Sequence, residues 1–302
     1  MYRIVFSLCW LISLLPLRVL YVFSDFMYLL VRFVVRYRRK VVRQNLRESF
    51  PEKTEKELRE IERKFYHAFC DYFVEDIKCF SMSKEQMMKR MTFGNVEWLK
   101  EGFEKGDYQI VFLFLGHFGN WEWIASIPYF FPKVNVSQVY HKLYNDVSER
   151  LFLYLRERYG GECITMQNTF RRLYQLKKEG KKVFCGFISD QQPKWEAIHH
   201  FTPFLNHETA VFIGGEHIAK RLDAVLAYGR MSRVRRGYYH LDIIPISTDS
   251  KSVPDYEATD QYMRMLEEDI KKNPHLWLWT HKRWSRTKEE WERRQAANGN
   301  DA

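Results

Sequence analysis

The segment 116–122, which reads Gly-His-Phe-Gly-Asn-Trp-Glu, carries the side chains of this sequence best suited to acid–base chemistry. A neutral imidazole can take a proton from a hydroxyl, and a carboxylate bonded to its other ring nitrogen fixes the tautomer that does so. His117 and Glu122 are five residues apart, which is about 140° on a continuous helix. They would converge only if the histidine lies on a turn, which the glycines permit, and the glutamate lies in a helix that Asn120 caps.

This pair has the composition of a triad's base and orienting carboxylate, but no serine or cysteine lies beside it. A substrate hydroxyl is therefore the expected nucleophile. Backbone N–H groups around Gly119 and Asn120, at the start of the expected helix, are candidates for binding an oxyanion. The spacing alone is a weak signal, because a histidine after a strand is often a hydrogen-bonded structural residue.

The elements that must position this segment follow from the hydrophobic pattern. Short apolar runs typical of buried strands recur at 110–115, 134–140, 183–189, 224–231 and 238–246. Stretches with helical character, including 145–159 and 170–179, separate the earlier runs. This alternation predicts an α/β fold with a mixed, largely parallel sheet flanked by helices. Sites in such sheets lie beyond the carboxyl ends of the strands, which is where His117 falls.

The first 35 residues are almost wholly apolar and aromatic, and they predict an N-terminal hydrophobic membrane-anchor helix. Pro16 interrupts them, and the longest uncharged run, 4–17, is shorter than the roughly 20 residues of an upright span. A basic run follows at Arg32, Arg36, Arg38, Arg39, Lys40, Arg43 and Arg47. Such a run binds anionic membrane lipid and marks the cytoplasmic side. The alternative is a buried amphipathic helix of a soluble domain, and the choice between crossing the bilayer and lying in its surface stays open.

The whole-chain composition narrows the function classes. The 302 residues include 9 Trp, 18 Tyr and 23 Phe, and the net charge is +10. Amphipathic rings suit a membrane interface, and a basic surface attracts anionic lipid, nucleic acid or an acidic protein. The aromatic residues are not interleaved with Lys and Arg as in a base-stacking surface, which argues against a nucleic-acid-binding protein. Together with the acid–base segment at 116–122, this also argues against a non-enzymatic membrane-surface protein.

Cysteine and histidine usage points away from a metal site. The five cysteines are scattered without a CxxC pair, the pattern of free buried thiols in a reducing compartment. The neighbours His199 and His200 have no cysteine or carboxylate at ligand spacing. We expect neither a metal nor a cofactor.

Several ordered motifs resemble those of one family, the late acyltransferases of lipid A biosynthesis, also called the lauroyl/myristoyl acyltransferase family. His117 and Glu122 match its His-x4-Asp/Glu signature, and residues 45–52 look like its opening. Asp190-Gln191 is similar to its later Asp-Gln motif, and residues 274–284 are similar to its terminal Trp-x-His-x-Arg-Trp/Phe element. The resemblance covers nearly the whole chain.

The resemblance implies acyl transfer from an acyl-carrier protein thioester to a hydroxyl of a lipid A precursor, at the cytoplasmic face of the inner membrane. His117 would be the general base with Glu122 as its partner. The expected domains are a membrane-anchoring segment at 1–35 and an acyltransferase domain at 36–302, with a helical lead-in at 36–105 and an α/β core at 106–302. The alternative is a lysophospholipid or other glycolipid acyltransferase, with acyl-CoA or a carrier protein as donor.

Four further residues are candidates for substrate binding. Asp190 and Gln191 follow an apparent strand at the same sheet edge, although a polar cap on the next turn is an equal alternative. Arg283 could pair with an anionic head group, with His281 beside it, although packing of the terminal segment is the stronger reading. The chain departs from the family at Tyr140-His141, where Tyr-Arg is common, and at 204–206, where Phe-Phe-Gly is usual. Both departures place the identity of the acceptor in question more than the reaction.

Overall fold

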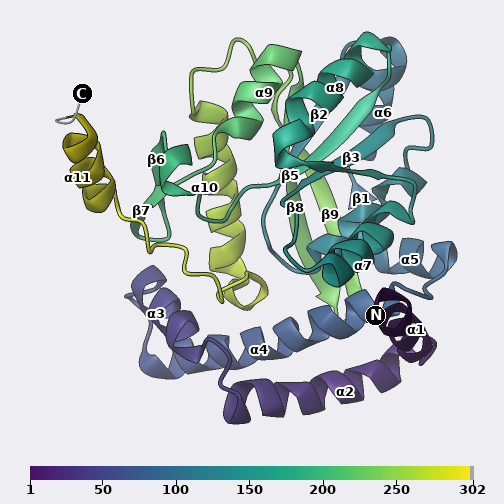
Figure 1. Ribbon diagram of the computed structural model, residues 1–302, viewed down its shortest axis with the longest axis vertical. Coiled ribbons are helices and arrows are strands. Elements are labelled where there is room, and N and C mark those ends of the chain that lie inside the picture. The colour runs from purple at the N-terminus through teal and green to yellow at the C-terminus, as the bar shows by residue number, and fades with distance from the viewer. Residues whose placement is uncertain (300–302) are drawn as a thin grey trace.

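The computed structural model describes residues 1–299, and a seven-stranded sheet forms its centre (Figure 1). The strand order is β1-β9-β8-β2-β5-β3-β4. The strands are β1 (Met91–Gly94), β2 (Ile110–Leu115), β3 (Asn135–Tyr140), β4 (Glu162–Thr165), β5 (Val183–Ile188), β8 (Val225–Arg235) and β9 (Tyr238–Ser247). The β8–β9 pair is antiparallel and the other pairs are parallel. The sheet is therefore mixed and largely parallel, as predicted.

Helices cover both faces of this sheet, so its central strand is wholly buried. All six residues of β2 are buried, which explains its uninterrupted apolar sequence. On one face, the ring of Phe131 stacks on Phe184 of β5. On the other face, Phe114 of β2 stacks on Tyr262 of α10. The helices after β1 are α6 (Val96–Lys105), the 3-10 helix η2 (Trp121–Tyr129), α7 (Asp146–Glu157), α8 (Thr169–Lys178), α9 (Gly214–Leu222) and α10 (Glu257–Lys272).

The helices before β1 form a layer beside the sheet. After the N-terminal apolar segment they are α3 (Arg39–Ser49), α4 (Glu55–Lys78) and α5 (Lys84–Arg90). The long α4 begins after a turn at Pro51, and a capping box joins Thr54 and Glu57 at its first turn. Because α4 passes beneath the sheet, it lies between the N-terminal helices and the site (Figure 1).

The N-terminal apolar segment forms two helices and not one. Helix α1 (Tyr2–Ser13) and helix α2 (Leu17–Leu29) meet near Pro16, and α2 continues into a π-helical turn, Leu30–Val34. Within residues 1–299 no single helix is both long and apolar enough to cross a membrane, whereas this pair qualifies together but is bent by 112°. Large apolar side chains are exposed along both helices. The N-terminus can therefore present an apolar surface to a bilayer, as a bent pair.

Most of the predicted elements are confirmed to within a few residues, and four short strands were missed. The run 110–115 is β2 without a shift in its bounds, and 170–179 corresponds to α8. β1 lies inside the stretch expected to be a helical lead-in, so that expectation is wrong there. β4 and the hairpin of β6 (Phe201–Phe204) and β7 (His207–Ala210) were also missed. All are four-residue strands, too short to show a period of two clearly. The remaining elements are the short η3 (Met166–Asn168), η4 (Trp195–Ala197) and η5 (Pro274–Leu276), and α11 (Lys288–Gly299).

Candidate active site

His117 lies one residue beyond β2, on a loop that the C-terminal segment holds in place. Its backbone carbonyl accepts a hydrogen bond from the N–H of Leu278 at 3.0 Å, and the next residue, Phe118, forms an isolated β-bridge with Trp277. On the other side, the N–H of His117 donates to Asp190 Oδ2 at 2.9 Å. These contacts fix the backbone of a turn that its sequence alone would leave flexible.

The carboxylate that orients the imidazole is Asp190. Its Oδ1 lies 2.6 Å from His117 Nδ1, and its Oδ2 accepts a second side-chain hydrogen bond from Trp277 Nε1 at 2.7 Å. Asp190 follows β5, the parallel neighbour of β2, so the two carboxyl ends meet at one edge. The residue is fully buried.

The charge state of Asp190 decides the histidine tautomer. Burial raises the pKa of this carboxyl, but the adjacent imidazole and the hydrogen bonds from His117 and Trp277 outweigh it, and the pKa falls below its usual value. An ionised Asp190 only accepts hydrogen bonds, so His117 Nδ1 carries the proton and Nε2 is left as a proton acceptor. The alternative of a polar cap for Asp190 therefore does not describe its contacts.

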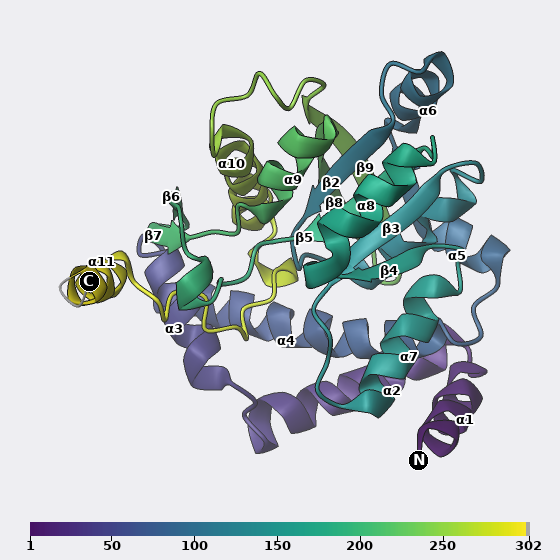
Figure 2. The same ribbon diagram turned by 45° about the horizontal axis from the view of Figure 1, so that its top comes forward.

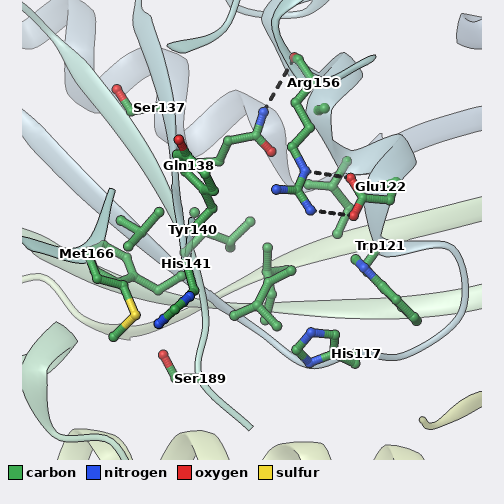
Figure 3. Close-up of a pocket in the computed structure, with 18 of the residues that line it drawn as sticks. His117, Trp121, Glu122, Ser137, Gln138, Tyr140, His141, Arg156, Met166 and Ser189 are labelled. Carbon is green, nitrogen blue, oxygen red and sulfur yellow. Dashed lines mark hydrogen bonds and ion pairs between the residues drawn. The ribbon is translucent and has the colours of Figure 1, made fainter. Parts of the chain in front are cut away.

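Glu122 does not occupy the place beside His117 that the sequence suggested. Its carboxylate forms a two-pronged ion pair with Arg156 of α7, with Nη2–Oε1 at 2.6 Å and Nε–Oε2 at 2.7 Å. Figure 3 shows Glu122 directed at this guanidinium and away from His117, with Trp121 close to both. The expected hydrogen bond between His117 and Glu122 is thus replaced by Asp190. The reason is that η2 starts at Trp121 and turns the glutamate toward α7.

Gly119 and Asn120 are occupied by contacts with the C-terminal segment, the start of η2 and helix α4. The N–H of Gly119, which has φ +65°, donates to the carbonyl of Leu276 at 2.9 Å. Asn120 caps η2 as expected, accepting from the N–H of Trp123 at 3.2 Å, and its Nδ2 donates to Glu75 of α4 at 2.9 Å. Asn120 is completely buried. The expectation that these two residues contact substrate is therefore not supported by their geometry.

The three remaining predicted residues differ in their access to the site. Gln191 and His281 line the same cavity as His117. Burial and the nearby Arg283 lower the pKa of His281 to about 4, so its ring is neutral near pH 7. Arg283 itself is buried, and its Nη2 donates to the carbonyl of Ala210 at 2.8 Å. Arg283 therefore anchors the terminal segment to the end of β7 and does not line the cavity. This agrees with the alternative that the terminal segment packs against the core.

One apolar cavity of about 690 Å³ opens at this edge of the sheet. It contains the side chains of His117, Glu122 and Arg156, and its volume is that of a site for a sizeable organic ligand. Much of its wall is aliphatic or aromatic, including Leu113, Ile124, Val136, Phe152, Leu153, Phe184 and Ile218. Sequence reasoning missed Arg156 because its partner lies 34 positions away. It expected the terminal segment to pack, whereas the indole of Trp277 in that segment also bonds Asp190.

The fold and the site together define an α/β enzyme with an imidazole–carboxylate pair facing an aliphatic cavity. The chain matches the family model described as bacterial lipid A biosynthesis acyltransferase over residues 2–286, and it belongs to that family. A search among curated proteins found no match. The resemblance of the motifs is thereby confirmed, and the protein is an enzyme of lipid A biosynthesis with a lipid A precursor and an acyl donor as its substrate classes.

Proposed function

We propose that this acyltransferase moves a fatty acyl chain from an acyl-carrier protein thioester to a hydroxyl of a lipid A precursor, at the cytoplasmic face of the inner membrane. One observation carries the proposal. The His117 imidazole is bonded through Nδ1 to the buried Asp190, and its ring faces an aliphatic cavity of about 690 Å³. A base held in one tautomer beside an apolar chamber suits deprotonation of a lipid hydroxyl.

The chemistry is direct transfer within one ternary complex. His117 Nε2 takes the proton of the acceptor hydroxyl as that oxygen attacks the thioester carbonyl carbon. The C–S bond then breaks, and the imidazolium returns the proton to the leaving thiolate. Asp190 stabilises the imidazolium between these steps, and general-base help of this kind is worth roughly 10²–10⁴-fold in rate.

Glu122 is proposed to act through Arg156. The ion pair occupies two of the five N–H groups of the guanidinium, and Arg156 lines the cavity. A cation held at this wall is the best candidate to stabilise the oxyanion, in place of the occupied N–H of Gly119. The direct His117–Glu122 contact is the competing proposal, and the variants in the Discussion separate the two.

Charge and surface support the donor and the location. The net charge of +10 suits electrostatic steering of an acidic carrier protein and binding of anionic membrane lipid. The exposed apolar side chains of α1 and α2 end near the basic run that begins at Arg32, the arrangement of a cytoplasmic-side anchor. The alternative donor is acyl-CoA, and a direct comparison of turnover with the two thioesters decides between them.

The two departures from the family pattern lie in different places. His141 lines the cavity, so the absence of arginine there acts inside the candidate active site. Leu205 and Asn206 instead form the turn of the β6–β7 hairpin, with φ of 50° and 64°. Asn206 tolerates this conformation well, and its Nδ2 donates to the carbonyl of Ser49 at 2.9 Å. Only the first departure therefore bears on the alternative of a lysophospholipid or other glycolipid acceptor.

The first prediction concerns His117→Ala. We expect loss of acyl transfer by at least about 10²-fold, because among residues 1–299 no base other than His117 is bonded to Asp190. The measurement is mass spectrometry of products from the purified enzyme, given an acyl-carrier protein thioester and either a lipid A precursor or a lysophospholipid. Thermal unfolding and membrane fractionation should match the parent protein. Near-normal turnover by His117→Ala would refute the mechanism. If the parent enzyme acylates the lysophospholipid and not the lipid A precursor, the proposed acceptor is wrong.

A further inference from the structure

The cavity beside His117 extends along both faces of β3. Successive residues of a strand point to opposite faces of its sheet. A cavity confined to one face would be lined by every second residue. Here the neighbours Val136 and Ser137 both line it, and so do the neighbours Gln138 and Val139. The cavity therefore passes over the carboxyl edge of the sheet and has an arm on each face.

The first arm lies against α7, and we call it the α7 arm. Val136 of β3 pairs in register with Phe184 of β5, and Leu113 of β2 pairs with Gly186, so these side chains share one face. Phe152 and Leu153 of α7 close the arm from outside. Gly186 carries no side chain at this place, which leaves room between the strands and the helix.

The second arm lies against α9, and we call it the α9 arm. Val139 and Phe187 belong to the opposite face of the sheet, and Gly214 and Ile218 at the start of α9 complete the wall. A Cβ added to Gly214 would meet no atom within 4 Å, so the space in front of this helix is open. Figure 3 shows Met166, which belongs to this arm, and Glu122 at opposite ends of the group of lining side chains.

We propose that the two arms hold the two aliphatic chains of the reaction at the same time. The acyl chain being transferred lies in the α9 arm, and an aliphatic chain of the acceptor lipid lies in the α7 arm. This inference rests on the proposed function. Direct transfer requires the thioester and the hydroxyl at His117 together, and the two arms meet at the edge where His117 lies.

The position of the N-terminal helices assigns the chains to the arms. Helix α1 packs on α7, with the rings of Phe6 and Tyr154 centred 4.9 Å apart, and it exposes apolar side chains such as Ile4 and Leu8. Figure 2 shows α1 beside α7, with α9 on the far side of the sheet. A lipid whose other chains stay in the bilayer therefore reaches the α7 arm first. A donor delivered by a water-soluble carrier does not need to come from the bilayer, so we assign its acyl chain to the α9 arm.

The arms are deep enough for aliphatic chains. The α7 arm reaches Val136 and the α9 arm reaches Ser137, which lie four and three residues before β3 ends at Tyr140, or about 13 Å and about 10 Å along the strand. Each wall is mainly hydrocarbon, so each methylene of a bound chain gains binding free energy by leaving water. Two separate arms also explain how two chains avoid competing for one groove.

The test uses the same substitution on opposite faces of one strand. Val139→Phe fills the α9 arm, and Val136→Phe fills the α7 arm. Both are made in a His117→Ala background, and the probe is a carrier-protein thioester of a dodecanoyl chain that ends in a diazirine. After photolysis, mass spectrometry locates the label. We expect labelling of Met166 or Ile218 in the parent, a loss of at least tenfold in Val139→Phe, and retention in Val136→Phe.

A second readout uses the otherwise unmodified enzyme. Val136→Phe should raise the KM for the lipid A precursor at least tenfold, and Val139→Phe should shift donor preference to shorter chains. Gly214→Leu and Phe152→Trp repeat the test from the helix side if either strand variant unfolds. Label on α7 in the parent, or equal loss in both strand variants, would overturn the two-arm assignment. Because labelling needs no turnover, this result is independent of whether the lipid A precursor is acylated.

Discussion

At the scale of single residues, the site depends on the three hydrogen bonds that Asp190 accepts. One oxygen accepts from His117 Nδ1, and the other accepts from the N–H of His117 and from Trp277. A carboxylate meets all three because both of its oxygens are acceptors. Its negative charge also stabilises the imidazolium that forms when a hydroxyl is deprotonated.

Asp190→Asn tests this arrangement with little change in shape. The amide oxygen should face the two donors from His117 N and Trp277, which turns the NH₂ group toward His117 Nδ1. The ring proton then moves to Nε2, where it blocks the base. We expect kcat to fall by roughly 10²–10⁴-fold while KM for the donor changes little. Steady-state kinetics with the acyl-carrier protein thioester provide the measurement.

Glu122→Gln is the matched comparison, because it neutralises the carboxylate that the sequence paired with His117 and that lines the cavity beside Arg156. It keeps a hydrogen bond to Arg156 but loses the ion pair, so we expect a smaller loss of kcat than in Asp190→Asn. The opposite order, with Glu122→Gln the more severe, would favour the direct His117–Glu122 contact. An unchanged rate in Asp190→Asn would remove Asp190 from the mechanism.

At the scale of elements, two parallel strands bring the pair together. His117 and Asp190 are 73 positions apart, but β2 and β5 are paired and end at the same edge of the sheet. Helix α4 supports the loop from below, because Glu75 bonds Asn120 at 2.9 Å and Tyr239 of β9 at 2.9 Å. The start of α4 lies far from the cavity. A substitution there can therefore change the stability of the protein without changing its activity.

Thr54→Ala should destabilise the protein without touching the chemistry. Thr54 accepts from the N–H of Glu57, and its own N–H donates to the Glu57 carboxylate at 2.8 Å. Loss of this capping box should lower the free energy of unfolding by about 1 kcal/mol. Denaturant unfolding measures the loss, and kcat/KM at low temperature should equal that of the parent. Thr54→Ser retains the cap and should behave as the parent in both assays.

At the scale of the whole molecule, the N-terminal helices have two faces with different roles. Toward the core, Tyr21 donates to Glu75 at 2.8 Å and Ser24 donates to Asp71 at 2.7 Å. Arg236 bridges Asp25 and Asp71. Away from the core, Val22 and Phe26 are 68% and 58% exposed, an arrangement that an aqueous setting disfavours and a bilayer satisfies.

A pair of exposed substitutions tests the membrane role. Val22→Asn with Phe26→Asn should release the protein from vesicles of anionic phospholipid while the melting temperature stays within about 2 °C of the parent, because neither side chain is buried. Sedimentation with vesicles measures the binding. Ser24→Ala, on the inner face, should do the reverse and lower stability while binding persists. Equal vesicle binding by the double variant would show that this face is not the anchor.

The sequence by itself determined the features that depend on local pattern. Continuous apolar runs identified β2 and β5, and motif order identified the family. It also placed His117 at the end of a buried strand. Each of these depends on residues within a few positions of one another, where composition and spacing constrain the backbone directly.

Only the tertiary structure decided which carboxylate orients His117. Glu122 is nearer in sequence, but the pairing of β2 with β5 brings Asp190 to the imidazole, and α7 brings Arg156 to Glu122. It also decided that the N–H of Gly119 is used by the loop and that the cavity reaches both faces of β3. The physical reason is that these contacts join segments tens of residues apart, and strand register and helix packing, not local spacing, determine which of them meet.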